Sequence, residues 1–142
     1  NKGLYKGDKF LEVSKRIVSL VLTAKLKDEV RKRDASFIRK MLHEGKDQEE
    51  VNEYVENQYK LLLDKCYIDD LGAINFQQLE KLRTEFPALG LKELFVTGTR
   101  LSNGTLKVFS ADSDPNMAIV DAVRITMSFP FAFEPIIYQG EY

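Results

Sequence analysis

The four prolines of this 142-residue chain divide it into two halves that can fold in different ways. All four lie in the last 56 residues, and the first 86 residues contain none. Proline removes a hydrogen bond from a helix and clashes with its preceding turn, so a proline-free stretch of this length allows long, uninterrupted helices. The second half, which contains every proline, favours shorter elements.

Four helices are predicted in the proline-free half from the spacing of apolar residues. The first covers residues 9–22 and has a broad apolar stripe, which predicts a wide buried face. The second covers residues 25–43, and Gly45 is placed to end it as a left-handed residue. A break at residues 34–36 is compatible with this helix, because Asp34 and Ser36 are good caps.

The other two helices have clear starting signals. Asp47, followed three residues later by Glu50, resembles a capping box, and apolar residues then follow on one face as far as residue 62. The fourth helix is predicted to start after Asn75 and to stop at Pro87, since the residue before a proline avoids the helical region.

The two middle helices differ in charge. Residues 25–43 carry seven basic and three acidic groups, while residues 47–64 carry one basic and six acidic groups. One interpretation is an antiparallel helical hairpin whose solvated flanks complement each other. The other is a surface that binds a partner.

The sequence pattern of the second half predicts strands around one helix. An apolar run at residues 94–96 leads to Thr97-Gly98-Thr99, Asn103-Gly104 is a strong hairpin turn, and residues 106–109 form the return strand. A further strand is predicted at residues 136–138.

The helix of this half is predicted to start at Asp114-Pro115 and to run to Met127. It is apolar nearly all round, which predicts burial. Only Asp121 and Arg124 interrupt it, either as an ion pair or as contacts to neighbouring loops.

Composition excludes several classes of function. Lys and Arg total 21 against 22 Asp and Glu, so the chain has no net positive charge. This excludes binding to nucleic acid or to an anionic membrane through overall charge. One cysteine and one histidine exclude an internal disulfide and a Cys/His zinc site. There is no apolar run long enough to span a membrane and no signal-peptide pattern.

No catalytic constellation is apparent in the residues themselves. His43 is expected to be a helix C-terminal residue and Cys66 a small buried one. Asp69-Asp70 reads as a solvated loop before Gly72. The motifs of serine-hydrolase elbows, phosphate-binding loops, dinucleotide folds and zinc proteases do not occur.

Five short motifs, the last of them in two parts, nevertheless resemble, in order, the patatin-like phospholipase family. They are GLYKGD at residues 3–8, NFQQL at 75–79, LFVTGT at 94–99 before the hairpin, DAVRITMSFP at 121–130, and FEP with GEY at 133–135 and 140–142. Two positions depart from the family pattern: Thr126 stands where Ser or Ala is usual, and Phe129 is bulkier than the usual residue.

The resemblance implies an α/β, three-layer patatin-like fold, of which residues 1–142 would form part of one catalytic domain. Residues 11–73 match no family motif and are expected to be a helical insertion. Residues 74–142 would supply a strand, a hairpin and a buried helix of the core. Because the motifs run to both ends and the chain starts with Asn1, we expect a piece of a longer protein, which in isolation would expose apolar surface and aggregate.

The family's mechanism, a Ser–Asp dyad without histidine, metal or cofactor, is implied by the same resemblance. Its serine is expected before Asn1 and its aspartate just after Tyr142, so no catalytic residue is expected within the chain. Expected pocket residues are Ser128, Phe129, Pro130, Phe131 and Phe133. The three phenylalanines either line an acyl-chain slot or are ordinary aromatic core packing.

The preferred hypothesis is therefore part of a lipid acyl hydrolase that cleaves ester bonds of phospholipids at a membrane surface. An alternative is a non-catalytic or regulatory piece whose helical insertion binds a membrane or a protein, such as a host activator. A third is a helical interaction module with a coincidental α/β tail. The resemblance leaves localisation open between the cytoplasm and a secreted bacterial effector. Oligomeric state and lipid specificity also stay open.

Overall fold

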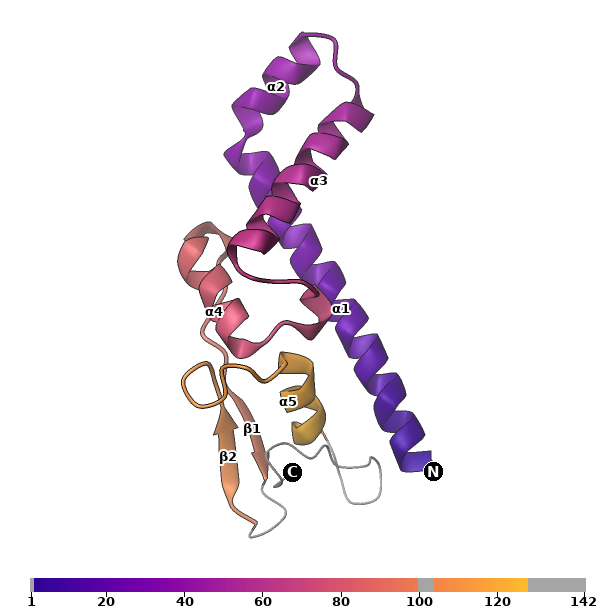
Figure 1. Cartoon of the computed structure of the whole chain (residues 1–142), viewed down its shortest axis with the longest axis vertical. Helices are drawn as coiled ribbons and strands as arrows, with labels where there is room; N and C mark the ends of the chain where they lie inside the picture. The colour runs from indigo at the N-terminus through magenta and orange to yellow at the C-terminus, as the bar shows by residue number, and fades with distance from the viewer. Residues whose placement is uncertain (1, 100–103, 128–142) are drawn as a thin grey trace.

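The computed structural model describes residues 2–99 and 104–127, with side chains from residue 8 onward. Five α-helices are found there: α1 (Lys2–Arg33), α2 (Ala35–His43), α3 (Gln48–Lys65), α4 (Phe76–Glu85) and α5 (Ile119–Thr126). Two 3₁₀ turns, η1 (Leu71–Ala73) and η2 (Pro87–Leu89), and two strands, β1 (Val96–Thr99) and β2 (Leu106–Phe109), complete the described elements. Figure 1 shows α1 as a long rod, with the α2–α3 pair at one end and the strands and α5 toward the other.

One helix, α1, replaces the predicted helix over residues 9–22 and the first part of the next. The predicted boundary near residue 23 was wrong. Leu22, Leu26 and Val30 are all buried at a spacing of four, so a core-facing stripe runs through this point. The wide buried face predicted for residues 9–22 was wrong, because Val13, Ile17, Leu20 and Val21 are exposed. The break falls instead at Asp34, where the caps allowed one, and it separates α1 from α2.

The predicted helix ends are confirmed where they depend on local chemistry. Gly45 has φ +92°, the left-handed conformation expected of a residue that ends a helix. The Asp47 carboxylate accepts a 2.9 Å hydrogen bond from the Glu50 backbone N–H at the start of α3. Asn75 and Gln78 form a complete capping box at the start of α4, with bonds of 2.7 and 3.0 Å.

The predicted start of the last helix was wrong, because α5 begins at Ile119 rather than at Pro115. The backbone before it is occupied by pairing with a distant segment. Ile119 N donates to Ile74 O at 2.9 Å, and Phe76 N donates to Met117 O at 3.2 Å. This pairing holds Ala118 extended opposite Asn75, so the helix can start only after it. The predicted burial of the helix is confirmed, with five of its eight residues buried.

The two strands form an antiparallel hairpin in which Val96 pairs with Phe109 and Thr99 with Leu106. The return strand has its predicted bounds. Asn103 of the predicted turn lies outside the described residues, while Gly104 has φ +69°, as a two-residue hairpin turn requires. In the described part of the chain the sheet consists of these two strands alone, within a helix-rich mixed α/β structure.

The contacts between the end of α1 and α3 agree with one of the two interpretations of the middle helices, that of complementary charge. In Figure 1, α3 runs back alongside the end of α1 after the turn that follows α2. Lys27 on α1 and Glu56 on α3 form an ion pair of 2.6 Å, and Arg33 donates to Gln58 at 2.9 Å. A continuous apolar core joins α1, α3, η1, α4, β2 and α5. Within the described ranges, no helix is both long and apolar enough to cross a bilayer.

Candidate functional site

The end of helix α5 is held against strand β1. The Thr126 hydroxyl, in the last residue of α5, donates a hydrogen bond to the backbone carbonyl of Thr97. Beside it, a Cβ on Gly98 would lie 2.9 Å from Cγ2 of Ile125 and 3.1 Å from Cε2 of Phe109. A larger residue than glycine would therefore push the helix away from the strand. This contact fixes the point where the chain leaves α5.

A second close approach holds α1 near the same helix. In η1, a Cβ on Gly72 would come within 2.8 Å of the Lys15 carbonyl oxygen. The Asp70 carboxylate accepts a 2.9 Å bond from Gly72 N–H and so fixes this turn. Burial raises the pKa of Asp121 on α5, and the nearby charges of Lys15 and Arg124 counteract that rise. Asp121 therefore lies near two cations, Arg124 of its own helix and Lys15 of α1, whereas the predicted contact was an ion pair with Arg124 or a contact with a neighbouring loop.

The predicted pocket residues lie outside the described residues. They are Ser128, Phe129, Pro130, Phe131 and Phe133, and the predicted strand at 136–138 and the GEY segment are outside as well. Ser128 follows Met127, the C-cap of α5, directly. The structure therefore describes the element from which this segment departs, and the roles of the five residues stay predictions.

The remaining titratable candidates occupy the positions predicted for them. His43 is the exposed last residue of α2. Cys66 is 1% exposed, and burial raises the pKa of its thiol, which keeps it in the unreactive protonated form. Asp69 and Asp70 are exposed in the loop before η1. Among the described side chains, no group of three or more is placed to hold a metal ion.

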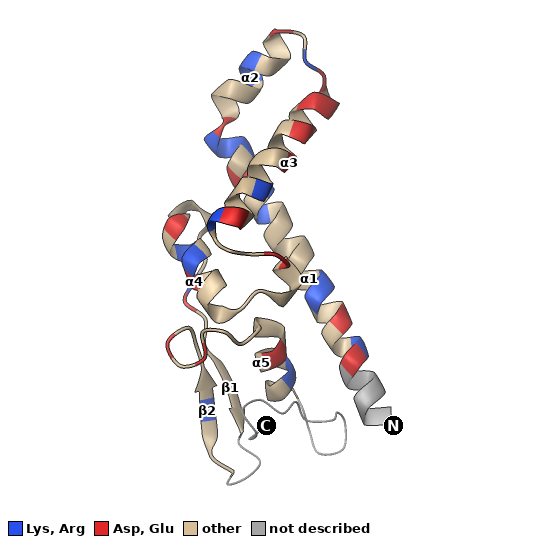
Figure 2. Ribbon diagram, in the orientation of Figure 1, with Lys and Arg blue, Asp and Glu red and all other residues tan. Residues whose placement is uncertain are grey.

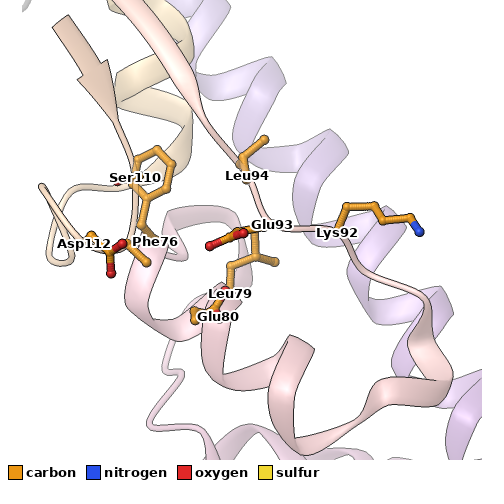
Figure 3. A pocket seen from close by; sticks show the side chains of 9 residues that line it. Phe76, Leu79, Glu80, Lys92, Glu93, Leu94, Ser110 and Asp112 are labelled. Carbon is orange, nitrogen blue, oxygen red and sulfur yellow. The ribbon is translucent and has the colours of Figure 1, made fainter.

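One hollow lies between α4 and the segments that flank the hairpin (Figure 3). Its apolar lining includes Phe76 and Leu94, and Ser110 and Asp112 lie beside Phe76 (Figure 3). Its volume is about 10 Å³, which is room for about one water molecule. It is far too small for an acyl chain, so it is not a candidate substrate pocket.

Sequence reasoning missed the positioning residues Gly98, Thr97 and Gly72. The available signal was weak: an isolated glycine inside a strand pattern indicates a close approach of another backbone or side chain. The partners of these glycines could not be read from the pattern, since Gly98 meets a helix that starts some twenty residues later.

The described geometry is that of a scaffold: a hairpin, a buried helix fixed to it, and a long helix behind. The family model of patatin-like phospholipases matches residues 3–142. The chain belongs to the patatin-like phospholipase family. This confirms the resemblance seen in five short motifs, and it places the chain in a family of lipid hydrolases.

The chain matches part of a longer relative. It is 28% identical over 82 residues to an uncharacterized protein of Acanthamoeba polyphaga mimivirus. The matched segment covers 58% of this chain and 23% of that protein, so the chain spans less than a quarter of the relative's length. No solved structure matches the chain.

Proposed function

We propose that this chain is part of a lipid acyl hydrolase that cleaves ester bonds of phospholipids at a membrane surface. Membership of the patatin-like phospholipase family across residues 3–142 is the observation that carries the proposal. The parent protein would use a Ser–Asp dyad without metal or cofactor. Its serine would come from a segment before Asn1 and its aspartate from one after Tyr142. The whole would adopt the three-layer α/β fold of the family.

In this proposal the chain supplies the scaffold that orients the dyad. In the absence of histidine the aspartate acts as the base that activates the serine, so its position relative to the serine is critical. A misplacement of about 1 Å can lower a rate by about 100-fold. The contact of Thr126 and Ile125 with strand β1 supports this role, because it fixes the helix that leads toward the expected aspartate.

The segment after α5 would form the substrate pocket. Ser128 and Pro130 would shape its entrance, and the side chains of Phe129, Phe131 and Phe133 would line an acyl-chain slot. An apolar slot of this kind suits the fatty acyl group of a phospholipid. The helical stretch 11–73 would be an insertion in the domain. It contributes the α2–α3 pair, which lies at the end of the molecule remote from the strands (Figure 1).

Covalent labelling of the parent protein tests the proposed nucleophile. A fluorophosphonate probe reacts with an activated serine, and peptide mapping identifies the labelled residue. We expect one labelled serine, in a Gly-x-Ser-x-Gly segment that precedes this chain, and loss of label when that serine is replaced by alanine. Absence of labelling in the folded protein, or labelling of a serine within residues 1–142, would overturn the proposal.

A further inference from the structure

Helix α2 lies at the end of the molecule remote from the strands, and none of its nine residues is buried (Figure 1). It nevertheless carries large apolar side chains. Phe37 and Leu42 are 48% and 46% exposed, and Ile38 and Met41 are only partly buried. An amphipathic helix normally hides its apolar face against the core. The apolar face of α2 is therefore only partly covered by α1 and α3.

A groove runs between the end of α1, helix α2 and the start of α3. Its volume is about 250 Å³, somewhat below the pockets of about 300–1,000 Å³ that hold drug-sized molecules. The space suits one or two side chains. Four apolar and three polar residues line it. The apolar residues are Ala35, Ile38, Leu42 and Val51, and the polar residues are Arg31, Arg39 and Gln48.

The two arginines of this groove are not neutralised within the described chain. Neighbouring cations have acidic partners: Lys32 pairs with Asp28 at 3.0 Å, and Arg33 pairs with Asp34 at 2.9 Å. By contrast, Arg31 has no ion pair among the described residues, and the one hydrogen bond found there for Arg39 goes to the Ser36 hydroxyl at 3.2 Å. Both are exposed. Their guanidinium groups are thus free to bind carboxylates in a bidentate manner.

We propose that this groove docks an acidic segment of a partner protein, with an apolar side chain inserted between α1, α2 and α3 and flanking carboxylates bound by Arg31 and Arg39. The apolar floor supplies the burial, and the arginines supply charge complementarity and orientation. This is the helix-in-groove or peptide-in-groove mode of recognition, on a surface remote from the two strands (Figure 1).

The distribution of charge favours an acidic protein segment over an anionic bilayer. Figure 2 shows acidic residues at the start of α3, next to the basic ones of α2. These include Glu49, Glu50 and Glu53, all exposed. A flat anionic surface that reached the two arginines would also meet this acidic end. A narrow acidic segment can lie along the groove without reaching the acidic start of α3. Repulsion by those glutamates also selects the orientation of the segment.

Selection of displayed peptides by the parent protein tests the proposal. From a library of random peptides, we expect enrichment of sequences in which Leu or Phe is flanked by Asp or Glu. The double variant Arg31→Glu/Arg39→Glu should weaken their binding at least about tenfold, since hydrogen bonds to charged groups are lost. The matched control Lys40→Glu makes the same type of charge change on α2, at an exposed residue that does not line the groove. It should leave binding within about twofold.

A neutral variant and a vesicle assay make the outcome decisive. The charge-reversal variant could weaken binding merely by unfolding the helices. Arg31→Gln/Arg39→Gln retains polar side chains and introduces no repulsion, so it should stay folded and still weaken binding. Peptides without acidic residues, or binding that survives both double variants, would overturn the proposal. So would binding to phosphatidylserine vesicles that falls equally with Lys40→Glu, which would assign the surface to membranes instead.

Discussion

The Tyr54 hydroxyl on α3 donates a 2.8 Å hydrogen bond to the carboxylate of Asp34, the residue that separates α1 from α2. The same carboxylate receives two 2.9 Å bonds from the Arg33 guanidinium. The ring of Tyr54 also meets the ring of Phe37 on α2, with centroids 4.9 Å apart. Helix α2 has no buried residue, so these contacts at its first turn fix its direction and thereby the shape of the proposed groove.

Removal of the Tyr54 hydroxyl should destabilise the helix pair. We expect Tyr54→Phe to lower the free energy of unfolding by about 1 kcal/mol, the usual value of a partly exposed hydrogen bond. Urea denaturation of the parent protein, or of the chain where it stays soluble, measures the effect. Tyr67→Phe is the matched control, because Tyr67 is 78% exposed and no bond of its hydroxyl is found in the described structure. An equal shift in both variants would contradict this role of Tyr54.

The stability of the junction between α1 and α2 should depend on pH. The Arg33 guanidinium, helped by the Tyr54 hydroxyl, lowers the pKa of Asp34 below its ordinary value of about 3.9. Between the lowered pKa of Asp34 in the folded state and its ordinary pKa in the unfolded state, the unfolded state binds more protons than the folded state. The stability that Asp34 contributes is therefore present above about pH 4 and is lost as the pH falls through the lowered pKa.

The variant Asp34→Asn isolates this effect from the other carboxylates. We expect the wild-type protein to be the more stable at pH 7 and its advantage to shrink as the pH is lowered from about 5 to about 2. Chemical denaturation at several pH values gives the difference directly. An advantage that stays constant over this range would show that the charge of Asp34 does not stabilise the junction.

Gly98 should not tolerate a side chain, because a Cβ there meets Ile125 at 2.9 Å. We expect Gly98→Ala to destabilise the protein by about 1–3 kcal/mol, the usual range for overpacking, and to lower the activity of the parent protein through displacement of α5. Thr99→Ala, at an exposed position of the same strand, is the control and should cost much less.

A double-mutant cycle shows whether the cost arises at the predicted contact. Ile125→Ala removes the Cγ2 atom that the new Cβ would strike. The double variant Gly98→Ala/Ile125→Ala should therefore be more stable than the sum of the two single effects, by about 0.5 kcal/mol or more. Strict additivity would locate the strain elsewhere.

An apolar stripe on the outer side of α1 should make the isolated chain associate. Val13, Ile17, Leu20 and Val21 are 47–65% exposed at helical spacing, which forms a continuous apolar face. We expect Ile17→Gln/Leu20→Gln to reduce self-association of the 142-residue chain in sedimentation velocity. The control Leu61→Gln, at a residue 58% exposed on α3, should change it little. An equal effect of the control would indicate general hydrophobicity rather than this stripe.

Features set by neighbouring residues could be predicted from the sequence. The start of α4 after Asn75, the left-handed Gly45 and the return strand at residues 106–109 all depend on contacts within a few positions. The start of α5 could not be predicted in this way. Its first turn is displaced by backbone pairing between residues 74–76 and 117–119, which are about forty positions apart.

The family could be predicted from the sequence, but the packing of the site could not. Five weak motifs in the correct order sufficed to indicate patatin-like phospholipases, and the family match over residues 3–142 confirms this. The contact between Gly98 and Ile125 carries no such signal, because nothing in either segment specifies the other. The exposed apolar face of α2 was equally hidden, since its apolar spacing alone predicts burial.

Release of fatty acid from phospholipid by the parent protein tests the central claim most directly. The assay compares vesicles of a diacyl phosphatidylcholine with vesicles of its diether analogue, which has the same head group and chains but no ester bond. The account predicts fatty acid release from the diacyl lipid alone, unchanged by a metal chelator. A folded parent protein that releases no fatty acid from diacyl phospholipids of any head group would contradict it.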